Sequence, residues 1–269
     1  MAHHPTMTAD DPIAPRLDHD DLSFEELARV YSYDRISDRR RLFAGLVIKE
    51  IRARCRPVRV MDIGCGNGMG VGPERAGYIE AIGAAADVMV GLEPDEQVEP
   101  VPGVFDHFQH ACLENARLEP GSIDVAYSYM VMEHVHDPAA FFDALIRVLV
   151  PGGTYLFITP NGRHLFTRIS MALHALKLDE LVLRLIMGTR AEAYHYPVRY
   201  RCQTPEAIGP MVEAAGLAPP EHAYVERAAL SGYFRGPLRP VLTFLAWKRR
   251  RFQNRECLLN LIGRVSRPG

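Results

Sequence analysis

The chain has 269 residues, of which 48% are hydrophobic and 24% charged, and these proportions exclude a wholly disordered chain, a coiled coil and a collagen-like fibre. Its formal net charge of −2, from 31 basic and 33 acidic residues, argues against a protein that coats nucleic acid, so no nucleic-acid partner is expected. The five cysteines are widely spaced and include no C-x-x-C pair, which argues against a metal site or a disulfide framework and favours a reducing, cytoplasmic location.

The first 55 residues divide into two predicted segments. Residues 1–21 are rich in His, Pro and Asp and lack the basic and apolar regions of a secretory signal, so they are expected to form a disordered leader. Residues 22–55 are expected to form an N-terminal helical cap, with Ser23 as its N-cap and acids in its first turn. No run of eighteen apolar residues occurs anywhere, so no transmembrane helix is predicted.

The segment 56–162 alternates between strand and helix patterns. Apolar, β-branched runs at 58–63, 88–93, 123–128 and 154–159 read as strands, and 138–149 carries apolar residues at helical spacing. Strands that alternate with helices indicate parallel pairing through crossover connections. The predicted fold class is therefore α/β, a Rossmann-like, doubly wound and mostly parallel sheet.

Two further segments follow this core. Residues 163–187 are strongly apolar with helical spacing, and 163–200 is expected to be an inserted helical lid over a substrate site, the alternative being contact with a membrane or a partner subunit. Residues 201–269 are expected to complete the core, with a helix that starts at Thr204-Pro205 and a last strand over 258–265.

The most informative motif is the run VRVMDIGCGNG, which begins at Val58 and ends at Gly68. A strand leads into glycines at positions 64, 66 and 68, and alternating glycines allow a ligand to approach the main chain because no Cβ intervenes. A P-loop is excluded because Gly68 is followed by Met69 and Gly70 rather than by Lys-Ser/Thr. A dinucleotide site would need its third glycine at position 69, which leaves an adenosyl ligand without a pyrophosphate as the remaining candidate.

This run resembles motif I of the class I S-adenosylmethionine-dependent methyltransferases, in particular the branch that acts on small molecules. Four later segments resemble that family in the same order. They are 90–94 with Glu93 at the end of a strand, 111–118, 122–135 and 149–156 with its Pro-Gly-Gly turn. The resemblance covers about residues 56–160 and implies S-adenosyl-L-methionine as the cofactor.

The resemblance also implies roles for individual residues. The glycine loop would approach the methionine part of the cofactor, Asp62 would hold the loop or the ammonium group, and Glu93 would accept hydrogen bonds from both ribose hydroxyls. Cys112 departs from the Asp that the family often has at the adenine edge, which leaves the backbone of Leu113 as the contact. The implied cofactor-binding residues are Asp62, Gly64, Cys65, Gly66, Gly68, Glu93, Cys112, Leu113, Tyr129 and Met130.

His134 is the candidate catalytic residue, because removing a proton from an alcohol or phenol at neutral pH suits a histidine base. A role in packing remains open for His134, as it does for the Tyr194–Tyr196 cluster that could line a substrate pocket. No metal-ligand spacing appears, so no metal is expected.

The predicted function is methyl transfer to a small-molecule or lipid-like acceptor, most simply O-methylation. The open alternatives are N- or C-methylation of a natural product, a nucleic-acid or protein methyltransferase, an NAD-dependent oxidoreductase, and a non-catalytic cofactor-binding scaffold subunit. The basic, aromatic run 247–252 could be a solvated helix face or could contact anionic lipid, so a peripheral membrane contact is a second candidate interaction.

Overall fold

A computed structural model describes residues 19–69, 77–176, 198–227 and 239–269. Their centre is an eight-stranded sheet in the order β1-β7-β8-β6-β5-β2-β3-β4. All neighbouring strands run parallel except β8, which is antiparallel to both β6 and β7. The doubly wound, mostly parallel sheet predicted from the sequence is confirmed.

The strands and helices have the following bounds. The strands are β1 (Ser32–Tyr33), β2 (Arg59–Ile63), β3 (Val88–Leu92), β4 (His107–Gln109), β5 (Ile123–Tyr129), β6 (Leu149–Pro160), β7 (Glu221–Glu226) and β8 (Asn260–Ser266). The α-helices are α1 (Phe24–Leu27), α2 (Arg39–Arg52), α3 (Tyr78–Ala85), α4 (Pro138–Val148), α5 (Leu165–Ala175), α7 (Pro205–Ala214) and α8 (Arg239–Phe252). Short 3-10 turns occur at His19–Asp21, Leu113–Asn115 and Arg255–Cys257.

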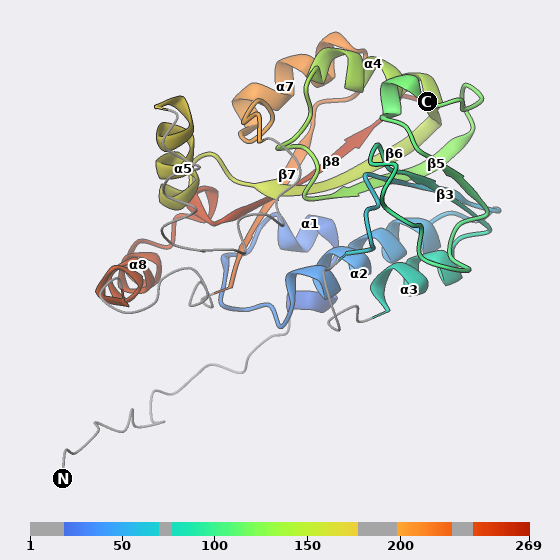
Figure 1. The fold of residues 1–269 in the computed structure, drawn as a ribbon. Coiled ribbons are helices and arrows are strands. Elements are labelled where there is room, and N and C mark those ends of the chain that lie inside the picture. Colours follow the sequence, from blue (N-terminus) through green and yellow to red (C-terminus); the bar gives the residue numbers. More distant parts are fainter. Residues whose placement is uncertain (1–18, 70–76, 177–197, 228–238) are drawn as a thin grey trace.

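Helices cover both faces of the sheet (Figure 1). The helices α1, α2 and α3 lie on one face, α4 and α7 lie on the other, and α5 and α8 stand at the end of the molecule near β7 and β8. The side chains of β2 alternate between these layers, since Val60 belongs to the cluster on the α2 side and Met61 and Ile63 to the cluster on the α4 side. This burial on both faces explains why the central strands are almost continuously apolar.

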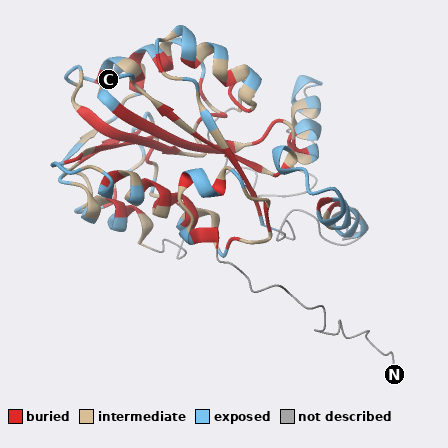
Figure 2. Cartoon of the chain, turned by 180° about the vertical axis from the view of Figure 1, so that it is seen from behind, coloured by how far each residue is buried: buried red, intermediate tan, exposed pale blue. Residues whose placement is uncertain are grey.

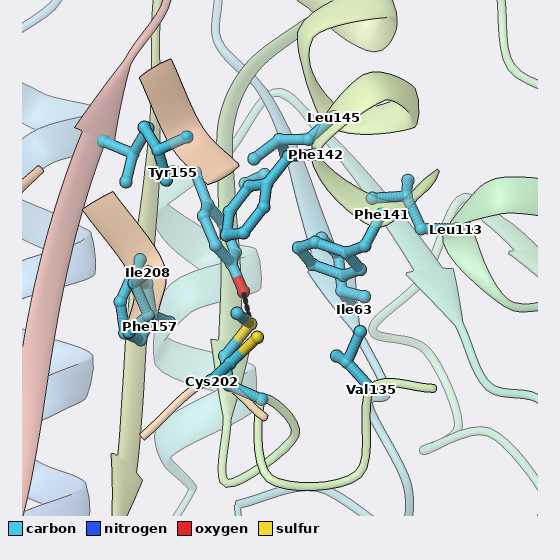
Figure 3. Close-up of a cluster of buried hydrophobic side chains, with 14 of the residues drawn as sticks. Ile63, Leu113, Val135, Phe141, Phe142, Leu145, Tyr155, Phe157, Cys202 and Ile208 are labelled. Atoms are coloured by element: carbon cyan, nitrogen blue, oxygen red, sulfur yellow. Dashed lines mark hydrogen bonds between the residues drawn. The ribbon is translucent and has the colours of Figure 1, made fainter. Parts of the chain in front are cut away.

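The cluster on the α4 side combines aromatic rings with aliphatic side chains (Figure 3). Phe141 and Phe142 of α4 meet at 5.4 Å between ring centroids, and Phe141 lies 5.8 Å from Tyr155 of β6. The Tyr155 hydroxyl is satisfied inside this core by Ser128 at 2.6 Å and by the sulfur of Met132 at 3.2 Å. The strand ends that carry the site residues are therefore fixed by a densely packed layer beneath them.

The N-terminal region differs from its prediction in two ways. Residues 1–18 lie outside the described part, but His19–Asp21, expected to belong to a disordered leader, form a 3-10 turn in which His19 and Asp20 are buried. Polar contacts fix this turn, because His19 Nδ1 lies 2.8 Å from Ser32 Oγ and Asp20 accepts from the backbone N–H of Ser37.

Residues 22–55 do not form one helical cap. The predicted N-cap Ser23 does begin α1 through a capping box, but β1 then interrupts the segment before α2. The buried side chains of α2, such as Phe43 and Val47, pack against the sheet beside α3. The helix α2 is thus part of the helical layer, and Arg39 at its first position is the residue that reaches the carboxyl end of β5.

The C-terminal half contains a strand, β7, that the predicted elements do not include. It completes the sheet by pairing with β8 and β1, while α7 begins at the predicted cap, Thr204. Of the expected lid over 163–200, α5 is described and 177–197 lies outside the described residues, so its role as a lid stays a prediction. Within the ranges that the structure describes, no helix is both long and apolar enough to cross a membrane.

Candidate functional site

The glycine loop follows the carboxyl end of β2 and is hydrogen-bonded to the carboxyl end of β3. The backbone N–H groups of Gly64 and Cys65 both donate to the carbonyl of Leu92, at 2.8 and 3.0 Å, and the N–H of Gly68 donates to the carbonyl of Cys65 at 2.9 Å. All three glycines adopt positive φ, at 68°, 50° and 90°, which L side chains rarely adopt. The turn therefore requires glycine at each of these positions.

Glu93 lies directly against this loop. Its Oε2 accepts from the backbone N–H of Gly66 at 2.8 Å, its Oε1 accepts from Asp95 at 3.0 Å, and the residue is only 3% exposed. Among the described residues, a Cβ placed on Gly66 would meet no atom nearer than Glu93 Oε2, at 3.9 Å, so this part of the structure leaves space above the loop. A bare backbone turn beside a fixed carboxylate fits an adenosyl ligand, because the carboxylate can accept from a ribose diol while the loop allows close approach.

Asp62 at the end of β2 lies beneath the loop. The Tyr127 hydroxyl donates to Asp62 Oδ2 at 2.8 Å, and Asp62 is buried. Burial raises the pKa of Asp62 to about 7, with a smaller contribution from the charge of Glu93 and an opposing one from the Tyr127 hydrogen bond. Burial, with Asp62 and Glu93 nearby, also raises the pKa of the Cys65 thiol. The loop therefore stands over a group of acids whose charge a cationic ligand would stabilise.

The turn that follows β5 packs against the same loop. A Cβ on Gly64 would lie 2.7 Å from Val131 Cγ2, so the missing side chain of Gly64 is what lets this turn approach. Met130 has a positive φ of 58° and its N–H donates to the carbonyl of Ile158, while the N–H of His134 donates back to the carbonyl of Val131. The half-buried His134 is thereby placed on a short turn next to the glycine loop.

Tyr129, one of the implied cofactor-binding residues, makes side-chain contacts that the sequence did not predict. Its hydroxyl accepts from Arg39 Nε at 2.8 Å, the Arg39 guanidinium also lies over the ring at 5.5 Å, and Phe43 packs against it at 5.8 Å. Burial raises the pKa of Tyr129 despite the neighbouring Arg39 cation. Tyr129 thus joins the end of β5 to the start of α2.

The predicted adenine edge divides into a buried and an exposed residue. Leu113 is 1% exposed, and its side chain packs into the cluster below α4 (Figure 3). Cys112 precedes it and is exposed, and burial of its thiol together with the charges of Glu114 and Glu93 raises the pKa of Cys112.

Two charged residues at the carboxyl ends of β5 and β6 are absent from the site predicted from the sequence. Glu133 is buried, accepts from Thr159 Oγ1 at 3.0 Å, and has its pKa raised to about 7 by burial. Arg39 also donates through Nη1 to Asn260 Oδ1 at 2.9 Å. Glu133 directly precedes His134, so its position as an acid shortly after a buried strand could have identified it from the sequence as a site residue. No neighbouring residue in the sequence indicates the partners of Arg39.

The Tyr194–Tyr196 cluster, which was predicted as a possible substrate-pocket lining, lies outside the described residues.

Comparisons with known proteins agree with this arrangement. A family model described as "Methyltransferase domain" matches residues 33–221, which is most of the chain. A probable S-adenosylmethionine-dependent methyltransferase of Mycolicibacterium smegmatis is 33% identical over 119 residues, which cover 43% of each chain. A ubiquinone biosynthesis O-methyltransferase of Neisseria meningitidis serogroup C is 32% identical over 115 residues, 40% of this chain and 47% of the relative. Each match thus spans less than half of the relative's length.

A solved structure shows the same fold. The SAM-dependent methyltransferase from Archaeoglobus fulgidus superposes with a TM-score of 0.53 at 15% identity, over 87% of this chain and 96% of that one. The family model also spans β2, the glycine loop, Glu93 and the turn that carries His134. The chain therefore belongs to the methyltransferase-domain family, and it has the fold of the class I S-adenosylmethionine-dependent methyltransferases.

Proposed function

We propose that this chain transfers a methyl group from S-adenosylmethionine to a hydroxyl of a small or lipid-like molecule. The observation that carries the cofactor assignment is the hydrogen bond between the Gly66 backbone and Glu93 at the joined ends of β2 and β3. In doubly wound sheets, ligands bind outside the carboxyl ends of the strands. Gly66 and Glu93 follow the carboxyl ends of β2 and β3.

The cofactor supplies an electrophilic methyl group on a cationic sulfonium. The chain's own residues hold and align it: the Glu93 oxygens accept from the ribose hydroxyls, the glycine loop lies along the amino-acid portion, and Asp62 offers negative charge beneath the loop. Cys112 and the Leu113 backbone border the adenine, and Met130, held at positive φ next to the loop, borders the reacting end. Alignment and exclusion of water are the main contributions that such a displacement needs from a protein.

His134 is the proposed base for the acceptor hydroxyl. A hydroxyl becomes a good nucleophile when its proton is removed as the bond forms, and imidazole titrates in the range where this works at neutral pH. The turn that carries His134 rests against Gly64 through Val131, so a base at this position borders the cofactor loop. The O-methyltransferase name of the Neisseria relative supports oxygen as the acceptor atom, and no nucleic-acid substrate is proposed.

A turnover assay with labelled S-adenosylmethionine tests the proposal. The full chain is incubated with methyl-labelled cofactor and a panel of phenols and catechols with and without isoprenoid tails, and release of S-adenosylhomocysteine is measured. We expect labelled product whose methyl carbon is bonded to oxygen by NMR. Cofactor binding without turnover on any acceptor would favour the scaffold alternative, and label on nitrogen or carbon would replace O-methylation by the other transfer reactions.

A further inference from the structure

The helix α8 is held in a fixed rotation against the body of the protein. Arg249 Nε donates to Glu226 Oε2 at 3.0 Å, and these residues are only 8% and 3% exposed. The Tyr31 hydroxyl donates to the backbone carbonyl of Arg249 at 2.7 Å, and Leu245, one turn earlier on the same side, is buried. These contacts define an inner face of α8, so the residues on its opposite side are directed outward.

The outer face of α8 carries large aromatic side chains in solvent. Phe244 and Trp247 are each 56% exposed, and their ring centroids lie 5.8 Å apart. Figure 2 shows α8 largely in the colour of exposed residues. The helical period places both residues, together with Arg251, on the side away from Leu245 and Arg249. Phe252, 63% exposed, extends the aromatic group at the helix end, with its ring 6.3 Å from that of Trp247. Exposed aromatic rings gathered in this way are unusual on a solvated surface.

Positive charge surrounds these rings. The sequence of α8 contains no Asp or Glu, and Lys248, Arg250 and Arg251 are exposed. Among the residues that the structure describes, none of these three forms an ion pair, because the buried carboxylate of Glu226 pairs with Arg249 instead. The outer face of α8 and its flanks therefore combine apolar area with three exposed cations that form no ion pair within the described part of the chain, while the Arg251 guanidinium lies 5.7 Å from the centroid of the Phe252 ring.

We propose that the outer face of α8 binds a lipid surface that carries anionic headgroups. In a helix that lies in a membrane interface, the aromatic rings enter the headgroup boundary while the cations meet the lipid phosphates. With fourteen residues at about 1.5 Å each, α8 is too short to span a bilayer and suits an orientation in the membrane plane. The inference does not depend on the proposed methyl transfer.

Trp247 makes the experiment specific to this helix, because it is the only tryptophan among the 269 residues. The full chain is mixed with vesicles of phosphatidylcholine alone or of phosphatidylcholine with phosphatidylglycerol. We expect a blue shift of tryptophan emission and quenching by brominated acyl chains with the anionic vesicles only, and a weaker effect at high salt.

A pair of double variants tests the role of charge. Arg250→Gln with Arg251→Gln should reduce sedimentation with anionic vesicles about tenfold or more. Arg52→Gln with Arg117→Gln removes the same charge from exposed positions on other elements and should sediment like the original chain. Trp247→Ser should also sediment less, while circular dichroism stays that of the folded protein.

Three results would overturn the proposal. The first is emission that does not change with anionic vesicles. The second is an equal loss of sedimentation in the two double variants, which would indicate a general charge effect. The third is an emission shift that rises with protein concentration without vesicles, which would identify the face as a contact between copies of the chain.

Discussion

The backbone N–H of Gly66 donates to the Oε2 of Glu93 at 2.8 Å, although the residues are 27 positions apart in the chain. Parallel pairing of β2 with β3 creates this contact, since Asp62 pairs with Gly91 and Ile63 with Leu92, so the segments beyond the two strands emerge side by side. The loop and the carboxylate thus form one binding element whose halves can be tested separately.

Substituting Gly66 by valine is expected to abolish S-adenosylmethionine binding. A side chain there occupies the open space beside Glu93 and also strains a backbone whose φ is 50°. Isothermal titration measures the loss, and Gly103→Val is the matched control. Gly103 has a φ of 74°, and a Cβ placed on it would meet no atom within 4 Å, so its variant bears the strain without filling the site. Unchanged affinity in Gly66→Val would refute the role of the loop.

Glu93→Gln is expected to weaken S-adenosylmethionine binding about tenfold. The amide can still accept from Gly66, but hydrogen bonds to a charged acceptor are stronger than those to a neutral one, and a tenfold loss corresponds to about 1.4 kcal/mol. Titration of both proteins with the cofactor gives the ratio. Glu96→Gln removes the same charge from an exposed position in the same loop and should bind normally. Equal effects of the two changes would show that only net charge matters.

Asp62 should make stability depend on pH. Its folded pKa of about 7 exceeds its ordinary value of 3.8, so the stability it contributes is fully present below pH 3.8 and is lost as the pH rises to about 7. The change is on the order of 4 kcal/mol. Urea denaturation at several pH values measures this change. Between pH 3.8 and about 7, the free energy of unfolding of the original chain should fall relative to that of Asp62→Asn, and above about pH 7 the difference between the two proteins should stay constant.

Tyr127→Phe provides the control for this titration. Loss of the hydrogen bond to Oδ2 removes a contact that favours the charged carboxylate, so the folded pKa of Asp62 rises further and the upper end of the window extends to higher pH. Glu133, whose pKa is also raised to about 7, is present in every variant, so its contribution to the pH dependence of stability cancels when the variants are compared. Parallel stability profiles for the original chain and Asp62→Asn would show that Asp62 titrates as an ordinary carboxyl group.

His134→Ala is expected to slow turnover by about 100-fold or more with little effect on cofactor affinity, as for loss of a general base. The paired control is His136→Ala, two residues further along the turn, where the side chain is exposed. Steady-state release of S-adenosylhomocysteine and cofactor titration separate the two effects. If His134→Ala turns over normally, the acceptor proton leaves by another route.

The sequence alone determined the elements that depend on local signals. The strand before the glycines, the acid that follows β3, the start of α4 at Pro138 and the Thr204–Pro205 start of α7 are each defined by residues within a few positions of one another. Backbone conformation, capping and burial patterns act over that range, which is why these predictions succeeded.

The tertiary structure decided what depends on distant partners. The edge strands β1 and β4 are short, and β1 and β7 are strands because they pair with each other although they lie far apart in the chain. Arg39 meets Tyr129 and Asn260 across 90 and 221 positions, and Glu226 meets Arg249 across an undescribed segment. Side-chain partners follow from how layers pack in space, and burial then sets the pKa of groups such as Glu133, so neither can be read from neighbouring residues alone.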